Sequence, residues 1–366
     1  MRTAPIRRLL ISASLALVIA QAALARPVVV GTCLSHLQTY STISQAVAAV
    51  ASGSTILICP GSYPEQVTIK QPLTLRGVRS GTAANPTVTV PPGGLTQSVI
   101  SPNNGIKMYF QILVLGTGTG LVNIENLAIN GSNNEVSNGW LEGVYYQNSS
   151  GVMNNLATYN QTGNGYGFGV FLESTTSDQK PVTVSHCSIH DFDAEGIRTN
   201  GNANLTVNIR SNAVVVSPST SLQINGIDIY GIGTVSDNSV ATRPGLQGGA
   251  GIGIATESGV TISNNTIVGM VIGIWPLGNS NVVFSNRVSF ANSAVVLSGT
   301  DNDVEHNHFY PGEGGAGVDF NCTGTGNTVI HNLFNDADWG IVSSGGSNTV
   351  TPNSFSNVAQ LISPPC

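Results

Sequence analysis

Charged and aromatic residues in the middle of this chain recur at intervals that predict one shared surface. They follow a two-residue step, Gly or Ala and then Val or Ile, that occurs nine times between residues 143 and 341. The steps begin at these residues: Gly143, Gly169, Gly196, Gly226, Gly251, Gly273, Ala294, Gly317 and Gly340. Successive residues of a strand point to opposite faces, so a branched residue that points into a core leaves its successor outside. The outward positions one and three residues after the branched residue include these side chains: Tyr145, Phe171, Glu173, Arg198, Asp228, Tyr230 and Trp275.

This combination of residue types favours a polysaccharide ligand. Aromatic faces stack on sugar rings, and the planar guanidinium of Arg198 can bind a carboxylate through two hydrogen bonds, which suits an acidic sugar. In a lyase, Arg198 would neutralise the substrate carboxylate, His190 or Tyr230 would abstract the C5 proton, and Asp228 with Glu173 would orient the sugar or hold Ca²⁺. The alternative is that Arg198 and Asp228 form an ordinary surface ion pair, with the aromatic residues packed under loops.

The segment "SHCSIHDFDAEGIR" lies next to these residues and is rich in ionisable groups. Its carboxylates Asp191, Asp193 and Glu195 alternate along the chain and are candidate Ca²⁺ ligands, because hard cations prefer several oxygens. The rest of an EF-hand loop is missing, so a solvated acidic turn is the alternative.

Two further groups lie closer to the C-terminus. His306 and His331 precede an Asn in two successive repeats, and stacked imidazoles can bind a transition metal, although turn histidines without a ligand are the alternative. Asp319, Asp336 and Asp338 form a second acidic area without an obvious partner base.

The spacing of the steps indicates the element that positions all these residues. Successive steps lie 21 to 30 residues apart, the length of one coil of a β-solenoid. A second set of residues, mostly Asn, recurs once per coil and predicts a ladder of stacked side chains at an inner turn, because Asn tolerates left-handed backbone. Its members are Asn155, Cys187, Asn212, Asn238, Asn265, Asn286, Asn307, Asn332 and Asn353. Charged residues make up only 9% of the chain, which suits stacked coils because like charges in a column repel.

The N-terminal part predicts a capped solenoid. Residues 41–51 have the pattern of a short amphipathic helix that can cover the open end of the first coil. Alternating strands follow, whereas residues 80–120 fit the coil period less well and are expected to form longer excursions. The stretch "YSTISQAVAAVASGSTILICPGSYPEQVTIKQPLTLRGV" resembles the opening of secreted right-handed parallel β-helix proteins of the pectin-lyase-like superfamily, including NosD-like repeat proteins and pectin methylesterases.

The resemblance implies the fold, and it transfers no catalytic residues. The chain contains neither the polygalacturonase Asn-Thr-Asp, Asp-Asp and Gly-His-Gly motifs nor the pectate lyase Arg-x-Pro-x-x-Arg. The Asp-Pro-His-Glu of mannuronan epimerases is also absent, and the pectin methylesterase active-site strings are not recognisable.

The N-terminus predicts export. Arg2, Arg7 and Arg8 precede an apolar run and the sequence Ala-Leu-Ala, so residues 1–25 are expected to be a signal peptide and the protein to be secreted or periplasmic. Of five cysteines, we expect Cys33 and Cys59 to form a disulfide, Cys187 to be a buried free thiol, and Cys322 with Cys366 to be a second candidate pair.

We therefore predict an all-β protein, a single right-handed parallel β-helix, or β-solenoid, with a short N-terminal capping helix. It spans residues 26–366, with the cap and first coils in 26–80 and regular coils in 121–360. A net charge of −6 argues against nucleic acid and anionic membranes as partners, and no mature segment is apolar enough to span a bilayer. We expect a monomer that interacts with extracellular polysaccharide, as a polyuronide lyase or epimerase with Ca²⁺ as the candidate cofactor. The alternative is a non-catalytic glycan-binding or adhesin β-helix of the cell envelope.

Overall fold

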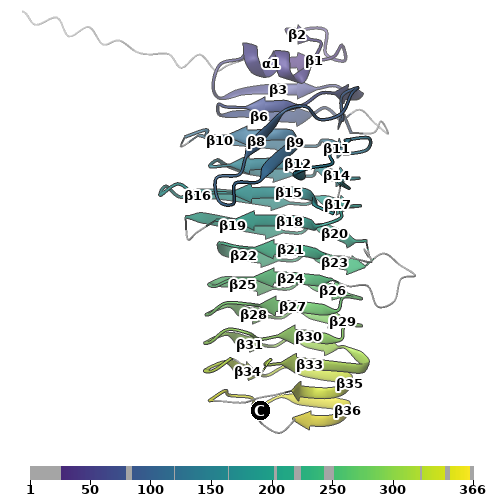
Figure 1. The fold of residues 1–366 in the computed structure, drawn as a ribbon, viewed down its shortest axis with the longest axis vertical. Helices are drawn as coiled ribbons and strands as arrows, with labels where there is room; N and C mark the ends of the chain where they lie inside the picture. Colours follow the sequence, from purple (N-terminus) through teal and green to yellow (C-terminus); the bar gives the residue numbers. More distant parts are fainter. Residues whose placement is uncertain are drawn as a thin grey trace, which may run out of the picture.

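The computed structural model describes residues 26–79, 85–118, 120–163, 165–201, 204–217, 224–242, 251–321, 324–342 and 347–362. The expected signal peptide and the candidate pair Cys322 and Cys366 lie outside these residues. The described strands stack into one elongated column, shown in Figure 1.

The column has three walls, and each coil contributes a strand to each wall. The first wall is a parallel sheet of these strands: β2 (Thr39–Tyr40), β1 (Val28–Val30), β3 (Ser54–Ile58), β6 (Leu73–Gly77), β10 (Leu121–Glu125), β13 (Ser150–Asn154), β16 (Lys180–Ser185), β19 (Leu205–Arg210), β22 (Ile232–Ser236), β25 (Val260–Ser263), β28 (Val282–Phe284), β31 (Asp303–Glu305) and β34 (Thr328–Ile330).

The second wall contains short strands, which pair in parallel with their neighbours: β4 (Ser62–Pro64), β7 (Thr87–Thr89), β11 (Ala128–Asn130), β14 (Ala157–Tyr159), β17 (Ser188–His190), β20 (Ala213–Val216), β23 (Ser239–Thr242), β26 (Thr266–Val268), β29 (Arg287–Ser289) and β32 (His308–Tyr310).

The third wall carries the predicted site: β5 (Val67–Ile69), β9 (Lys107–Leu115), β12 (Trp140–Gln147), β15 (Gly167–Glu173), β18 (Glu195–Asn200), β21 (Asn225–Ile229), β24 (Ile252–Thr256), β27 (Ile272–Pro276), β30 (Ser293–Val296) and β33 (Gly312–Asp319). Two long strands, β35 (Leu333–Val342) and β36 (Ser354–Ile362), join the second and third walls at the C-terminal end, since β35 pairs with both β32 and β33.

A continuous apolar core fills the space between the walls, and the branched residues of the repeated step lie in it. Ile197 and Ile227 are fully buried and lie opposite each other in β18 and β21. The preceding glycine is needed because wall two comes close: a Cβ on Gly196 would lie 2.7 Å from Val214 Cγ1 and 2.6 Å from the Gly226 carbonyl oxygen. The prediction of a parallel β-helix is confirmed.

One step was assigned to the wrong glycine. The segment Gly-Ile-Gly-Ile contains two candidates, and the prediction used Gly251 and Ile252. In the structure Ile254 lies opposite both Ile227 and Ile274, so Gly253 and Ile254 form the true step. The outward position in this coil is therefore Ala255.

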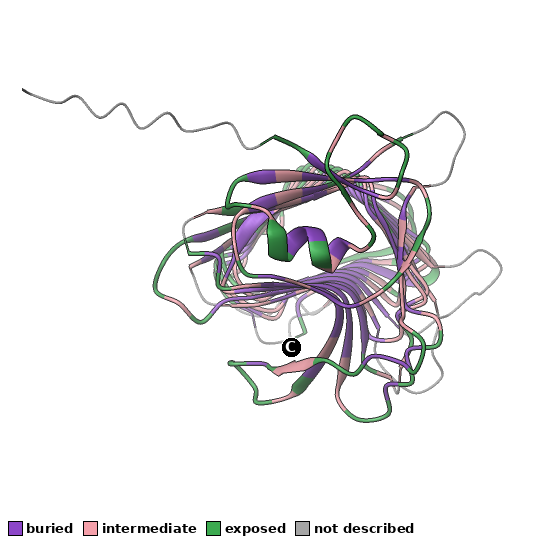
Figure 2. Ribbon diagram, turned by 90° about the horizontal axis from the view of Figure 1, so that it is seen from above, coloured by how far each residue is buried: buried purple, intermediate pink, exposed green. Residues whose placement is uncertain are grey.

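The helix α1 (Ile43–Ala49) closes the N-terminal end of the column (Figure 2). Thr42 caps it, because its side chain accepts a hydrogen bond from the Gln45 amide, and Ile43 and Val47 are buried against the first coils. Cys33 and Cys59 form the expected disulfide beside the cap. In the described residues, no helix is long and apolar enough to cross a membrane.

The inner turn contains a column of buried asparagines. Each side-chain amide from Asn212 to Asn332 donates to the next Asn in the column at 2.9–3.2 Å. The column ends at Cys187, whose backbone amide donates to Asn212. Asn155 was placed one residue out of register, since Asn154 pairs with Ser185 and Leu156 therefore takes the inner position. The left-handed residue is also the one before each column Asn from Asn212 to Asn332, for example Asn264 and His306.

Residues 80–120 contribute to the coils more than expected. β7 and β9 extend the second and third walls, and only the segment between them departs from the repeat. Within it, β8 (Ser98–Ile100) pairs antiparallel with β9 and leads into a loop that runs across the front of the third wall, visible in dark blue in Figure 1.

Candidate functional site

Arg198 and Asp228 are direct neighbours on the third wall, as the outward column predicted. They occupy matching positions in β18 and β21, and Arg198 Nη1 lies 3.5 Å from Asp228 Oδ2. The same nitrogen lies 2.5 Å from Glu195 Oε1, three residues earlier in β18. We call Glu142, Glu195, Arg198, Asn225 and Asp228 the Arg198 cluster.

The acidic members of the cluster have strongly perturbed titration. Burial and the neighbouring charge of Asp228 raise the pKa of Glu195 to about 8. Burial also raises the pKa of Asp228 to about 6, against the opposing effect of Arg198. The pKa of Glu142, which is fully buried, lies well above its ordinary value for the same reason. Near neutral pH the cluster therefore holds protons on carboxyl groups.

Several buried polar atoms of this cluster have no partner. Nine buried side-chain nitrogen and oxygen atoms of the described residues lack a hydrogen bond, and five belong to the cluster: both Glu142 oxygens, Glu195 Oε2, Arg198 Nε and Asn225 Oδ1. A proton shared with Asp228 would satisfy the Glu195 oxygen. The others mark a place where a water molecule or a polar ligand group is expected, because native structures rarely leave buried polar atoms unpaired.

Aromatic side chains surround the guanidinium of Arg198. The rings of Trp140 and Tyr230 lie 5.5 and 5.1 Å from its central carbon, within the range of cation–π contacts. Trp140 also stacks on Tyr166, with ring centroids 6.0 Å apart and planes 11° apart. Tyr166 is 44% exposed, so this stack presents a flat apolar face to solvent.

Tyr145, Phe171 and Glu173 do not face solvent, so the prediction of a free surface there is wrong. They point out of the central core as expected, but the loop after β8 covers them. Ser101 and the Asn103 amide donate to Glu173, which also accepts from the Tyr145 hydroxyl. Tyr145 and Phe171 therefore pack in a second apolar cluster with Met108, Phe110 and Phe168. The alternative of aromatics packed under loops holds for these two residues.

Trp275 is half-buried on β27, in the same column as Asp228. Its indole nitrogen donates to Ser298 Oγ at 2.9 Å. Two strand spacings separate it from Asp228, or about 10 Å, so it lies beside the cluster without joining it.

His190 is not part of the cluster. It lies at the end of β17 in the second wall, where its ring stacks on Tyr159 and its Nδ1 lies 2.7 Å from Asp191 Oδ2. The strands that carry Arg198 and Asp228 belong to the third wall, beyond the turn that follows His190. The structure therefore gives no support to His190 as their proton carrier.

The three candidate Ca²⁺ ligands do not converge either. Asp193 accepts hydrogen bonds from the backbone amides of Gly163, Gly165 and Gly167 and so shapes the turn that carries Tyr166. Glu195 contacts Arg198, and Asp191 contacts His190. Each carboxylate has a separate structural partner, and among the described residues the three are not a group whose ligand atoms lie close together.

Sequence reasoning missed five residues in or beside the cluster, among them Asn225, which directly precedes the repeated step in β21. Glu142 and Trp140 belong to β12 but precede the repeated step, and Tyr166 lies in a turn. Glu257 acts electrostatically on Asp228 and Tyr230 and was hidden by the misassigned step at Gly251. The alignment of successive coils could have identified Glu142, because Glu142 and Glu195 are strand-register partners of the same residue, Phe168.

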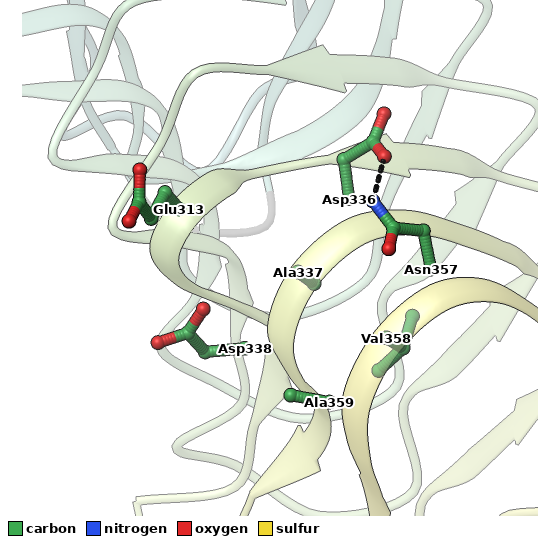
Figure 3. A pocket seen from close by; sticks show the side chains of 7 residues that line it. All are labelled: Glu313, Asp336, Ala337, Asp338, Asn357, Val358 and Ala359. Carbon is green, nitrogen blue, oxygen red and sulfur yellow. Dashed lines mark hydrogen bonds between the residues drawn. The ribbon is translucent and has the colours of Figure 1, made fainter.

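An open pocket of about 490 Å³ lies at the C-terminal end of the column (Figure 3). Glu313, Asp336 and Asp338 line it, and Asn357 donates to Asp336 at 2.7 Å. Asp319, the third member of the predicted acidic area, instead accepts from the Asn321 amide. Exposed carboxylates gather on many proteins without binding an ion, so this pocket alone does not define a site.

A family match and a solved structure with a TM-score above 0.5 support this fold. Residues 207–355 match the family described as "Right handed beta helix region". The lacto-N-biosidase GH136 from Eubacterium ramulus is similar with a TM-score of 0.60 and 13% identity, over 90% of this chain and 68% of that chain. The DFA-IIIase from Arthrobacter chlorophenolicus A6 has a TM-score of 0.49 and 15% identity, over 85% of this chain and 82% of that chain.

A third similar structure is pectin methylesterase PemA from Erwinia chrysanthemi, with a TM-score of 0.41 and 13% identity, over 66% of this chain and 79% of that chain. No curated protein matches the sequence. At these identities the similarities inform the fold alone. The family match and the three stacked walls show that this chain folds as a right-handed parallel β-helix.

Proposed function

We propose that the chain binds a neutral saccharide on the third wall, over the Arg198 cluster. The observation that carries this proposal is the group of unpartnered buried polar atoms beneath an aromatic surface. Sugar hydroxyls both donate and accept hydrogen bonds, so one ring can accept from Arg198 Nε and donate to the side-chain oxygen Oδ1 of Asn225. Small side-chain shifts are needed to open these atoms to the ligand.

The aromatic surface favours a sugar over other polar ligands. Trp140 and Tyr166 form a flat stack on one side of Arg198, and Tyr230 lies on the other. Such faces pack against the C–H groups of pyranose rings while the ring hydroxyls contact polar groups at the edge. The shared fold with the lacto-N-biosidase agrees with a carbohydrate ligand.

The charge of the cluster favours a neutral sugar over a uronic acid. Arg198 already contacts two carboxyl groups, from Glu195 and Asp228. A substrate carboxylate would have to displace Glu195 from the guanidinium and then lie among several acidic groups, which is electrostatically unfavourable. A polyuronide lyase or epimerase, the enzymatic hypothesis from the sequence, would need a cation free to neutralise that carboxylate.

A catalytic role on a neutral glycan is the second candidate, and one observation favours it. Burial raises the pKa of Glu195 to about 8 and that of Asp228 to about 6, so the pair holds about one proton between them near pH 7. Such a pair can donate and accept protons within one reaction. Binding without turnover would instead fit the non-catalytic glycan-binding alternative.

We further propose that the protein works outside the cytoplasm. The Cys33–Cys59 disulfide at the cap is stable in oxidising compartments and agrees with the signal peptide expected in residues 1–25. Expression with residues 1–25 attached, followed by fractionation and N-terminal sequencing, tests this. Mature protein beginning near Arg26 outside the cytoplasm is expected, and retention of uncleaved chain in the cytoplasm would contradict it.

Calorimetric titration of residues 26–366 with neutral and uronic oligosaccharides tests the binding proposal. We expect a neutral oligosaccharide to bind and Tyr166→Ala to weaken its binding by up to about tenfold, because an aromatic contact contributes about 0.5–1.5 kcal/mol. Arg198→Met should weaken it similarly. Phe290→Ala is the matched control, since this aromatic residue is 71% exposed in a later coil.

Two outcomes would contradict the proposal: binding only of polygalacturonate or alginate, or equal affinity in all variants. Incubation with the same panel separates the catalytic candidates. New reducing ends indicate cleavage of a glycosidic bond, and absorbance near 232 nm indicates the unsaturated product of a lyase.

A further inference from the structure

A second cluster of potential ligands lies on the first wall, away from the Arg198 cluster. His306 follows β31 and His331 follows β34, one coil further along. Their imidazole rings lie 5.2 Å apart and are tilted by 31°. Both side chains are exposed, so an ion in solution can reach them.

The backbone holds these two histidines in the same orientation. Both adopt left-handed backbone, with φ of 56° each. Each is followed by a buried Asn of the inner column, and Asn307 donates to Asn332 through its backbone amide at 2.9 Å and its side chain at 3.0 Å. The turn is therefore fixed from inside, and only side-chain rotations are free to change the distance between the rings.

A carboxylate completes the group. Glu305 precedes His306, and its Oε2 lies 3.6 Å from His306 Nδ1. One ligand atom from each of Glu305, His306 and His331 lies within 4.8 Å of the others. Tetrahedral ligands of one ion with bonds of about 2.0–2.2 Å lie about 3.4 Å apart, so side-chain rotations that shorten these separations by about 1.4 Å bring all three into range.

We propose that Glu305, His306 and His331 bind a divalent transition-metal ion of the zinc class. Two imidazoles and one carboxylate suit Zn²⁺, Ni²⁺ or Cu²⁺, whereas Ca²⁺ and Mg²⁺ prefer all-oxygen sites. The exposed position leaves the remaining coordination sites to water or to an external ligand. The site does not depend on the proposed saccharide binding, because it uses another wall and later coils.

The test uses residues 26–366 purified without a polyhistidine tag, titrated with ZnCl₂ in a calorimeter and by equilibrium dialysis. We expect one strongly bound ion per chain. His306→Asn and His331→Asn should each weaken its binding about tenfold or more, since each removes one of three protein ligands. Asn is the substitution of choice because Asn264 occupies the equivalent left-handed turn position in an earlier coil.

A control variant, a third ligand variant and a check of folding keep the result interpretable. His308→Asn changes an exposed histidine two residues from His306 that is outside the group, and it should leave zinc affinity unchanged. Glu305→Gln should weaken binding without altering the turn. Circular dichroism of each variant checks that the coils remain folded. Failure to take up zinc at 100-fold excess over protein, or binding that survives His331→Asn, would overturn the proposal.

Discussion

The Asn column of the later coils and the Arg198 cluster both bury polar side chains, but only the column gives its amides full sets of partners. Asn286, for example, donates to Ile262 and Phe284 carbonyl oxygens and to Asn307, and it accepts from Asn265. In the cluster, Glu142 has two buried oxygens and no hydrogen bond. Satisfied polar groups stabilise a fold, whereas unsatisfied ones cost stability and are retained where a ligand or reaction uses them.

The two regions also differ in regularity. Neighbouring column residues are 21 apart from Asn265 to Asn307, and the coils there carry short turns. The coils around Arg198 are longer and include the covering loop after β8. The regular coils thus provide a rigid column, and the departures from the repeat supply the distinctive side chains.

The largest expected effect is on the column itself. Asn286→Ala should lower the free energy of unfolding by about 3 kcal/mol or more, because it leaves buried carbonyl and amide groups of neighbouring coils without partners. Chemical denaturation measures this. Asn208→Ala, at a half-buried outward position on β19, is the control and should cost less than about 0.5 kcal/mol. Similar costs for both would mean that the column does not stabilise the later coils.

A smaller and local effect is expected at the covering loop. Ser101→Ala removes a buried hydroxyl that donates to Glu173 at 2.6 Å and should destabilise the closed loop by about 1–2 kcal/mol. Hydrogen exchange should then speed up in β8 and the start of β9, with no change in β28 and β31. Asn103→Ala should behave in the same way, because its side chain donates to the Asn200 carbonyl. Unchanged exchange in both variants would show that the loop is held by other contacts.

The carboxyl pair should make stability depend on pH. The folded protein holds a proton on Glu195 up to about pH 8, whereas the unfolded chain loses it near the ordinary carboxyl value of about 4.3. The folded state therefore binds more protons between these values, so this group contributes a loss of stability as pH rises from 5 to 8. Thermal melts of wild type and Glu195→Gln measure it.

From pH 5 to pH 8 the melting temperature of Glu195→Gln should fall less than that of the wild type, by a difference of a few degrees. The control is Glu125→Gln, which removes an exposed partner of Arg76 and should keep the slope of the wild type. Parallel curves for wild type and Glu195→Gln would contradict the raised pKa.

The repeat was predictable because backbone geometry controls it. A branched residue must enter a narrow core after each glycine, so the sequence repeats the step, and Ile197, Ile227 and their equivalents are buried as expected. The stacked coils and the pairing of Arg198 with Asp228 followed from this register, and the resemblance of the N-terminal stretch added the right-handed parallel β-helix. The error at Gly251 arose where two such steps overlap.

The rest of the site depends on parts of the chain that do not repeat. No periodicity could show that residues 98–106 fold over Tyr145 and Phe171, or that Asp193 pairs with three glycine amides rather than an ion. The burial of Glu142 could likewise not be predicted from the sequence, because a charged residue at an outward position normally faces water. These long-range contacts determine which outward side chains are accessible.

The central claim concerns where a saccharide binds, and a hydrogen-exchange footprint tests it most directly. Exchange of residues 26–366 is compared with and without the neutral oligosaccharide that binds most tightly. We predict protection in β12, β15, β18 and β21 and in the turn that carries Tyr166, with none in β28 to β32. Protection confined to the later coils, or none at a saturating ligand concentration, would contradict it.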